Sequence, residues 1–168
     1  MPSLRPLLAL ALLGFSTVAA QTNAERARAL QGAWQFVETS NPRTLQTIDN
    51  QQGYRLFVDG HFAWVRVNGL RPRPQVDSTA TSVQLWSVYE RLFTAQGGTY
   101  EVRGDTLITR TAVSETPAAM AAGNFNVWMY RVVGDELYVS LVGNQAGAVD
   151  NVITGLYTRV RFPTTPTN

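Results

Sequence analysis

Arginine and aromatic side chains alternate along one predicted β-hairpin, in a pattern that could hold a small acidic molecule. The hairpin consists of residues 53–58 and 61–67, joined by Asp59-Gly60, a dipeptide suited to the positive φ angles of a two-residue turn. Aromatic rings offer apolar contact area, and guanidinium groups bind carboxylates through paired hydrogen bonds. One face of the hairpin combines both kinds of group and carries Arg55, Phe57, Phe62, Trp64 and Arg66.

The opposite face of the same hairpin is apolar without arginine. It carries Tyr54, Leu56, Val58, His61, Ala63 and Val65. Because successive side chains of a strand point to opposite sides of a sheet, only one of the two faces can point into the protein. The alternation by itself leaves open which face that is.

Few residues of this chain could form a metal or catalytic centre. The absence of cysteine excludes disulfides, thiolate metal sites, cysteine nucleophiles and lipid attachment through an N-terminal cysteine. The only histidine, His61, lies beside a hairpin turn, and a haem held by His61 alone is the metal-containing alternative that remains. There is no Gly-x-Ser-x-Gly motif, and Asp135 and Glu136 fit a tight turn. We therefore expect no metal, no cofactor and no enzymatic activity.

Most of the chain reads as one strand after another. The alternating patterns predict strands at about 33–39, 53–58, 61–67, 98–103, 105–113, 124–133, 135–142 and 152–162. Long and short connections alternate, so all the long ones fall at one end of the strands and all the two-residue turns at the other. This sorting is typical of a barrel with a closed base and an open mouth. The sequence therefore predicts an all-β fold, an eight-stranded antiparallel up-and-down β-barrel.

Two helices are expected beside these strands. Residues 24–31 favour a short helix that Gly32 can end. Residues 82–95 form the one substantial helix, between the third and fourth strands near the barrel mouth, where its apolar face can lie over the opening. That face carries Val83, Trp86, Tyr89 and Phe93 at helical spacing.

The first 20 residues have the composition of a secretory signal peptide. Arg5 supplies the positive charge, residues 7–15 the apolar segment, and residues 18–20 a small-residue cleavage site before Gln21. The apolar segment is too short to cross about 30 Å of hydrocarbon. We therefore expect a secreted or periplasmic protein without a membrane span.

Length and charge indicate one small domain after the signal peptide. We expect an N-terminal segment over 21–31, the barrel over 32–162 and a disordered tail over 163–168. Every basic residue is an arginine, the formal net charge of the chain is +2, and no basic run stands out. Nucleic acid is therefore not an expected partner, and we expect a monomer.

Three short motifs resemble the lipocalin-like bacterial domains of the calycin superfamily, many of them uncharacterised secreted proteins. The motifs are Gly32-Ala33-Trp34, the hairpin segment 59–65, and residues 97–106. The resemblance implies a ligand inside the barrel and an inward orientation for the hairpin face that carries Trp64. It also implies that an arginine of the last strand packs on Trp34 across the base, where Arg159 matches better than Arg161. The chain departs from typical lipocalins in lacking their disulfide and in the place of its helix, which leaves the ligand class open.

These observations define a candidate site and a candidate function. Gly32, Trp34 and Arg159 are expected to be structural. The expected function is that of an exported binder or carrier of a small apolar or amphipathic molecule. The alternative is a barrel filled by its own side chains that binds another protein through its mouth loops. The candidate ligand-binding residues are Phe36, Glu38, Arg55, Phe57, Phe62, Trp64, Arg66, Trp128, Tyr130 and Tyr157.

Overall fold

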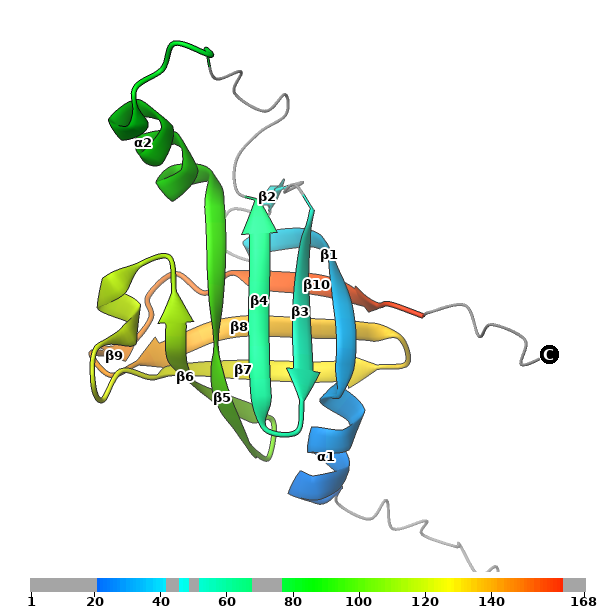
Figure 1. Ribbon diagram of the computed structural model, residues 1–168. Helices are drawn as coiled ribbons and strands as arrows, with labels where there is room; N and C mark the ends of the chain where they lie inside the picture. The colour runs from blue at the N-terminus through cyan, green and yellow to red at the C-terminus, as the bar shows by residue number, and fades with distance from the viewer. Residues whose placement is uncertain (1–20, 42–45, 49–51, 68–76, 162–168) are drawn as a thin grey trace, which may run out of the picture.

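The computed structural model describes residues 21–41, 46–48, 52–67 and 77–161 (Figure 1). The predicted signal peptide and the predicted tail lie outside these ranges. The helices are α1 (Asn23–Leu30), α2 (Ser82–Leu92) and the short 3-10 helix η1 (Pro117–Met120). The strands are β1 (Gly32–Asn41), β2 (Gln46–Ile48), β3 (Gly53–Val58), β4 (His61–Val67), β5 (Phe93–Arg103), β6 (Thr106–Ser114), β7 (Asn126–Val133), β8 (Glu136–Asn144), β9 (Gly147–Ala148) and β10 (Thr154–Arg159).

Eight of these strands close into one antiparallel barrel. Their order is β1-β3-β4-β5-β6-β7-β8-β10, and β10 pairs with both β8 and β1. Closure removes the free strand edges that an open sheet would expose. The predicted up-and-down barrel, closed between its first and last strands, is therefore confirmed.

The tight turns gather at one end of the barrel, which α1 helps to close. The Gly104 N–H donates to Asn23 Oδ1 at 2.8 Å, and the Asp59 N–H donates to Gln31 Oε1 at 3.2 Å. These hydrogen bonds tie α1 and the residue after it to two of the turns. The turns β3–β4, β5–β6 and β7–β8 contain positive-φ glycines at Gly60, Gly104 and Gly134.

Two of the long connections between the predicted strands contain short strands. β2 lies in the connection between β1 and β3 and pairs with the end of β1. β9 lies in the connection between β8 and β10 and pairs with the end of β8. Both short strands extend the hydrogen-bonded pairing at the ends of β1 and β8, at the end of the barrel away from the tight turns.

The helix predicted over 82–95 is three residues shorter than expected. It ends at Leu92, and β5 begins at once with Phe93. Residues 93–95 pair with residues 65–67 of β4, so inter-strand hydrogen bonds take the place of the last helical turn. Apolar spacing alone could not predict this end, because a strand pairing decides it.

The start of α2 agrees with the sequence pattern, but its position does not. Thr81 and Gln84 form a capping box, in which each backbone N–H donates to the other side chain. α2 rises from the mouth end of β5 and leads away from the barrel (Figure 1). Val83 and Trp86 are 78% and 64% exposed, so they do not cover the opening as expected. Neither α-helix in the described ranges is long and apolar enough to cross a membrane.

The largest fully buried side chains come from α1 and from strands all round the barrel. Burying a large apolar side chain contributes about 1.5–3 kcal/mol, so this set accounts for much of the stability of the fold. It comprises Leu30, Trp34, Phe57, Leu107, Leu137 and Tyr157.

Candidate ligand-binding site

A cavity of about 420 Å³ lies inside the barrel. Strands β1, β3, β4, β7, β8 and β10 all contribute to its walls. Its volume falls within the range of about 300–1,000 Å³ that is usual for small-molecule sites. The lining residues are Thr39, Arg55, Trp64, Arg66, Trp128, Val139, Leu141, Ile153, Gly155 and Tyr157.

Arg55 places a buried positive charge in this cavity. The residue is only 5% exposed, and its guanidinium carbon lies 4.4 Å from the ring centroid of Trp64 and 4.5 Å from that of Trp128. Its Nε donates a hydrogen bond to Tyr157 Oη at 2.9 Å. Each such cation–π contact contributes about 0.5–2 kcal/mol, depending on how far it is desolvated. An aromatic box thus holds the guanidinium in one place.

Within the described ranges no carboxylate balances the charge of Arg55. None of the salt bridges within the described ranges involves this residue. A guanidinium has five N–H donors, and Tyr157 takes only the one on Nε. Burying a charge without a counter-charge is unfavourable. A negatively charged group inside the cavity would therefore be strongly stabilised by Arg55.

Arg66 adds a second positive charge to the same cavity. Its guanidinium carbon lies 5.1 Å from the ring centroid of Trp64 and 5.9 Å from that of Phe36. Burial lowers the pKa of the Arg66 guanidinium from its ordinary value; Tyr157 raises it and the neighbouring charge of Arg55 lowers it. Arginine stays protonated at neutral pH even so. Two like charges therefore face one cavity and favour an anion between them.

Two inward-facing glycines leave room for these side chains. A Cβ added to Gly53 would lie 3.0 Å from Cγ of Arg66, and one added to Gly155 would lie 2.9 Å from the ring of Tyr157. Both glycines are buried, so a larger side chain could not turn away to solvent. The absence of side chains at these two positions thus helps to keep the cavity open.

Below the cavity the barrel is filled with aromatic side chains. Phe57 packs edge-on against Tyr100 with ring centroids 5.2 Å apart, and Phe36 packs in the same way against Tyr157 at 5.3 Å. Phe62 and Tyr130 are buried as well. Phe36, Phe57, Phe62 and Tyr130 were predicted to bind ligand, but the structure places them in the core and not in the cavity wall.

Glu38 lies on the outer face of the barrel. The register between β1 and β10 shifts between Phe36 and Glu38, so that Val37 is the extra residue of a β-bulge. The charge of Glu38 acts on Tyr138, whose ring contacts an exposed arginine outside the barrel. After the bulge Thr39 is buried and lines the cavity. The expectation that Glu38 shares the inner wall with Phe36 is therefore wrong, because strict alternation does not continue through a bulge.

The structure thus brings together half of the predicted ligand-binding set. The hairpin face with arginine points inward, as the resemblance implied. Val139 and Leu141 were missed although they alternate with Leu137 in β8, which is a signal that the sequence does contain. Thr39, Ile153 and Gly155 had no such signal. The predicted residues that line the cavity are Arg55, Trp64, Arg66, Trp128 and Tyr157.

At the base, Arg159 stacks on Trp34, as predicted. The guanidinium carbon lies 4.0 Å from the indole centroid. Nη1 donates to the carbonyl of Gln31 and Nη2 to that of Ala29, both at 2.7 Å, so Arg159 also caps the C-terminus of α1. Gly32 has a φ of +112°, and a Cβ there would lie 3.2 Å from Arg159 Nη1. The Gly-x-Trp motif therefore serves a backbone turn and a close approach at once.

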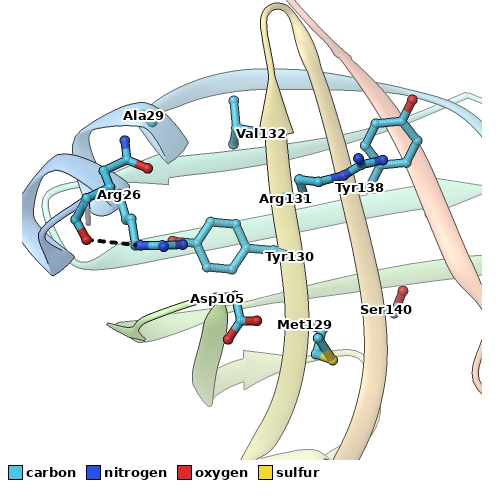
Figure 2. Close-up of a pocket in the computed structure, with 10 residues that line it drawn as sticks. Arg26, Ala29, Asp105, Met129, Tyr130, Arg131, Val132, Tyr138 and Ser140 are labelled. Atoms are coloured by element: carbon cyan, nitrogen blue, oxygen red, sulfur yellow. Dashed lines mark hydrogen bonds between the residues drawn. The ribbon is translucent and has the colours of Figure 1, made fainter. Parts of the chain in front are cut away.

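A second hollow, of about 600 Å³, lies beside α1 and β7 (Figure 2). In Figure 2 the guanidinium of Arg26 points toward the ring of Tyr130, and Asp105 lies below them. On the other side of β7, Arg131 packs against Tyr138 with its guanidinium carbon 4.7 Å from the ring centroid. Charges of both signs therefore share this open hollow. The interior cavity is the better candidate, since the charges of its described lining are of one sign and one of them, Arg55, is buried.

A metal or haem site finds no support in the geometry. The described ranges contain no group of three or more His, Asp or Glu side chains that could hold a metal ion. His61 is exposed at the β3–β4 turn, where its Nδ1 lies 3.1 Å from the carbonyl oxygen of Asp59. It does not line the cavity, so it offers no ligand to a haem there.

Comparison with known proteins finds similarity of structure only. No protein-family model matches the chain, and no curated protein matches its sequence. The chain is similar to a lipocalin-like protein from Bacteroides uniformis, with 10% identity, a TM-score of 0.46, and coverage of 79% of this chain and 99% of that one. The chain is also similar to an uncharacterized protein from Bacteroides eggerthii, with 11% identity, a TM-score of 0.42, and coverage of 78% of this chain and 99% of that one. A third similar structure is fatty-acid-binding protein 1 of Echinococcus granulosus, with 10% identity, a TM-score of 0.40, and coverage of 80% of this chain and 99% of that one.

Structural similarities this distant say nothing about ligand or activity. The order of the strands defines the fold. Eight antiparallel strands follow one another round a closed barrel, an N-terminal helix covers the base, and an arginine of the last strand stacks on the tryptophan of the first. The chain therefore has a lipocalin-like fold, a closed barrel of eight antiparallel strands.

Proposed function

We propose that this protein is an exported carrier that binds a small amphipathic acid inside its barrel. The observation that carries the proposal is the state of Arg55, a buried guanidinium that faces a cavity and forms no salt bridge within the described ranges. A carboxylate or a similar anion would supply the counter-charge. Arginine binds such groups through two parallel hydrogen bonds, which fix orientation as well as charge.

The walls of the cavity suggest how such a ligand would lie. The rings of Trp64 and Trp128 hold Arg55 among the buried residues, whereas Ile153 is 41% exposed and marks the opening. Val139 and Leu141 add aliphatic surface to the wall. The acid would therefore enter head first, with its anionic group at the inner end and its apolar part toward the mouth.

The two kinds of contact would contribute differently to affinity. Apolar contact contributes roughly 25 cal/mol for each Å² removed from water, whatever the charge of the ligand. A hydrogen bond to a charged group contributes about 1.5–3 kcal/mol and is lost when the ligand is neutral. A preference for the acid over a neutral molecule of the same shape is thus the signature of the proposed site.

Matched ligand pairs test this signature. We would extract the purified protein, identify any bound molecule by mass spectrometry, and titrate tryptophan fluorescence with retinoic acid against retinol and palmitic acid against palmitamide. At least one acid should give a saturable change, with an affinity roughly 10- to 100-fold above that of its neutral partner. Arg55→Met should remove this preference. The control Arg110→Met, on an exposed residue of β6, should leave it unchanged.

Two results would contradict the proposal. One is the absence of saturable binding by any member of the panel and of any co-purified acid. The other is equal affinity for the acid and the neutral member of every pair, because Arg55 would then make no charged contact with the ligand.

Export is the second part of the proposal, and it rests on residues 1–20 alone. The order of a positive, an apolar and a small-residue segment is that of a cleaved signal peptide. N-terminal sequencing of protein taken from the natural host should give a start at Gln21. A chain that retains Met1 and remains inside the cell would contradict export without affecting the binding proposal.

A second candidate function is binding of another protein at the mouth. The exposure of Val83 and Trp86 on α2 favours it, whereas the cavity counts against the filled barrel that this alternative assumed. Variants of α2 and of the cavity distinguish the two candidate functions. Loss of a captured partner on Trp86→Ala, with full retention on Arg55→Met and no acid binding by the wild type, would favour the second candidate.

A further inference from the structure

We propose that two copies of this protein associate through the outer face of strands β3 to β6. These strands are consecutive in the barrel. β3, β4 and β5 stand side by side at the front of Figure 1, and neither α1 nor α2 crosses them. The outward side chains of such a sheet are normally polar, because they face water. Here they are mainly apolar, which distinguishes this face from the rest of the barrel surface.

The register of the strands brings these apolar side chains into rows. One row crosses β3, β4 and β5 through Tyr54, Val65 and Ala95. Neither this row nor the longer one contains a charged side chain on these strands. The longer row runs across five strands through Ala33, Leu56, Ala63, Gly97 and Val113.

The exposed apolar area of this face is large for a small domain. Its larger side chains are between 38% and 70% exposed. Together they present roughly 500–600 Å² of apolar surface, the upper end of what a monomer usually leaves in one patch. They are Tyr54, Leu56, Val58, Val65, Phe93 and Val113.

The chemistry of the face favours a second copy of this chain over other occupants. The rows through Leu56 and Val65 are apolar and can pack against the same rows of a second copy, whereas the exposed charges of β5 and β6, on Glu101, Arg103 and Arg110, lie nearer the tight turns than these rows. Ala63 and Gly97 lie between the larger Leu56 and Val113, so two such sheets can approach to the usual distance of about 10 Å. The formal net charge of the chain, +2, also causes little repulsion between copies.

The buried area indicates the strength of this association. Two copies of the face would bury roughly 1,200 Å² in total, which is the lower limit for a specific interface. We therefore expect a dimer of micromolar affinity, in place of the monomer expected from the sequence. The cavity is lined by inward side chains, so the dimer neither depends on ligand binding nor blocks it.

Sedimentation velocity of the purified protein tests the proposal. We would work from about 1 μM to about 200 μM, a range that brackets the affinity of an interface of minimal size. The wild type should shift from monomer to dimer within this range. Leu56→Arg and Val65→Lys place a charge at the centre of the face and should each weaken dimerisation at least tenfold. The control Met129→Arg, at a half-exposed outward position of β7, should not.

Each outcome decides the proposal once circular dichroism has shown that the variants keep the fold. Dimerisation that Leu56→Arg or Val65→Lys weakens and Met129→Arg retains supports it. A wild type that remains monomeric throughout the range overturns it, even if another protein or a vesicle binds this face. A dimer that survives both central substitutions, or that Trp86→Lys on α2 abolishes instead, overturns the assigned surface.

Discussion

Arg159 and Arg55 both stack on tryptophan in the barrel, and they differ in what surrounds the guanidinium. Arg159 lies on Trp34 at the base and donates to two backbone carbonyls at the end of α1. Arg55 lies between Trp64 and Trp128 in the cavity, and within the described ranges its guanidinium donates only to a tyrosine hydroxyl. The first arginine has partners that are part of the fold, whereas the second keeps donors available. The same pair of residue types is therefore structural in one place and suited to ligand binding in the other.

The local backbone explains this difference. The last carbonyls of a helix have no partner within the helix, and the end of α1 places two of them beside Arg159. Arg55 stands in the middle of β3, where the backbone groups are engaged in pairing with β1 and β4. Within the described ranges no backbone carbonyl accepts a hydrogen bond from the Arg55 guanidinium. Donors that the sheet cannot satisfy are left for a ligand.

The largest expected effect is the loss of the ring beneath Arg159. Trp34→Ala should lower the free energy of unfolding by about 3–5 kcal/mol, as truncation of a large buried aromatic side chain does. Urea denaturation followed by circular dichroism measures this. The control Trp86→Ala, on an exposed residue, should stay within about 0.5 kcal/mol of the wild type. A Trp34→Ala loss below the effect of this control would show that the base stack is not structural.

Removing the base guanidinium should have a smaller but clear effect. Arg159→Met should lower the free energy of unfolding by about 2–3 kcal/mol, since the cation–π contact and two carbonyl hydrogen bonds disappear together. Chemical denaturation again provides the value. A double-mutant cycle with Trp34→Leu should show coupling, and strictly additive effects would mean that the two side chains do not act on each other.

Gly32 tests the close approach at the base. Gly32→Ala should cost about 1–2 kcal/mol, because the residue has a positive φ and its Cβ would press on Arg159. Gly60→Ala is the matched control, since Gly60 also has a positive φ but has open space around it. We expect the Gly32 variant to unfold at the lower denaturant concentration. Equal effects at the two glycines would leave only backbone strain as the cause.

The same change at Arg55 should act in the opposite direction from that at Arg159. Without ligand, Arg55→Met should leave the free energy of unfolding unchanged or raise it, within about 1 kcal/mol, because it removes a buried charge for which the described residues provide no salt bridge. Thermal unfolding of the ligand-free protein measures this. A loss as large as that of Arg159→Met would mean that Arg55 is structural after all.

The smallest expected effect is a change of stability with pH that arises from Tyr100 near the closed end of the barrel. Burial raises the pKa of Tyr100 above its ordinary value of 10.0, Gly60 lowers it by a hydrogen bond, and the charge of Asp59 raises it. The folded protein holds the phenolic proton more tightly than the unfolded chain. This contribution is therefore complete below about pH 10 and is lost as the pH rises through the folded-state pKa. Tyr100→Phe should flatten the alkaline decline in stability, and an unchanged decline would point to another group.

Strand order and barrel closure could be predicted from local features of the sequence. Turn dipeptides such as Asp59-Gly60 determine where two strands meet, and alternation determines how they face each other. The stack of Arg159 on Trp34 followed from the resemblance alone, since 125 residues of chain separate the two positions in the printed sequence. Half of the residues that line the cavity were also predicted, because inward faces repeat every second residue.

The β-bulge, the end of α2 and the open space of the cavity depend on contacts between distant segments, which no local sequence pattern predicts. The bulge at Val37 sends Glu38 outward and Thr39 inward, and the pairing of residues 93–95 with β4 shortens α2. The open space depends on Gly53 and Gly155, whose neighbours are known only once the strands are paired.

The sequence by itself determined which faces of the chain alternate, where they turn, and that arginines and tryptophans occur together. Only the tertiary structure decided which arginine has partners. Hydrogen-bond satisfaction depends on atoms brought together from distant segments, as when α1 supplies its carbonyls to Arg159 of the last strand. In the part of the chain that the structure describes, the barrel wall supplies none to Arg55, because its backbone acceptors pair between strands.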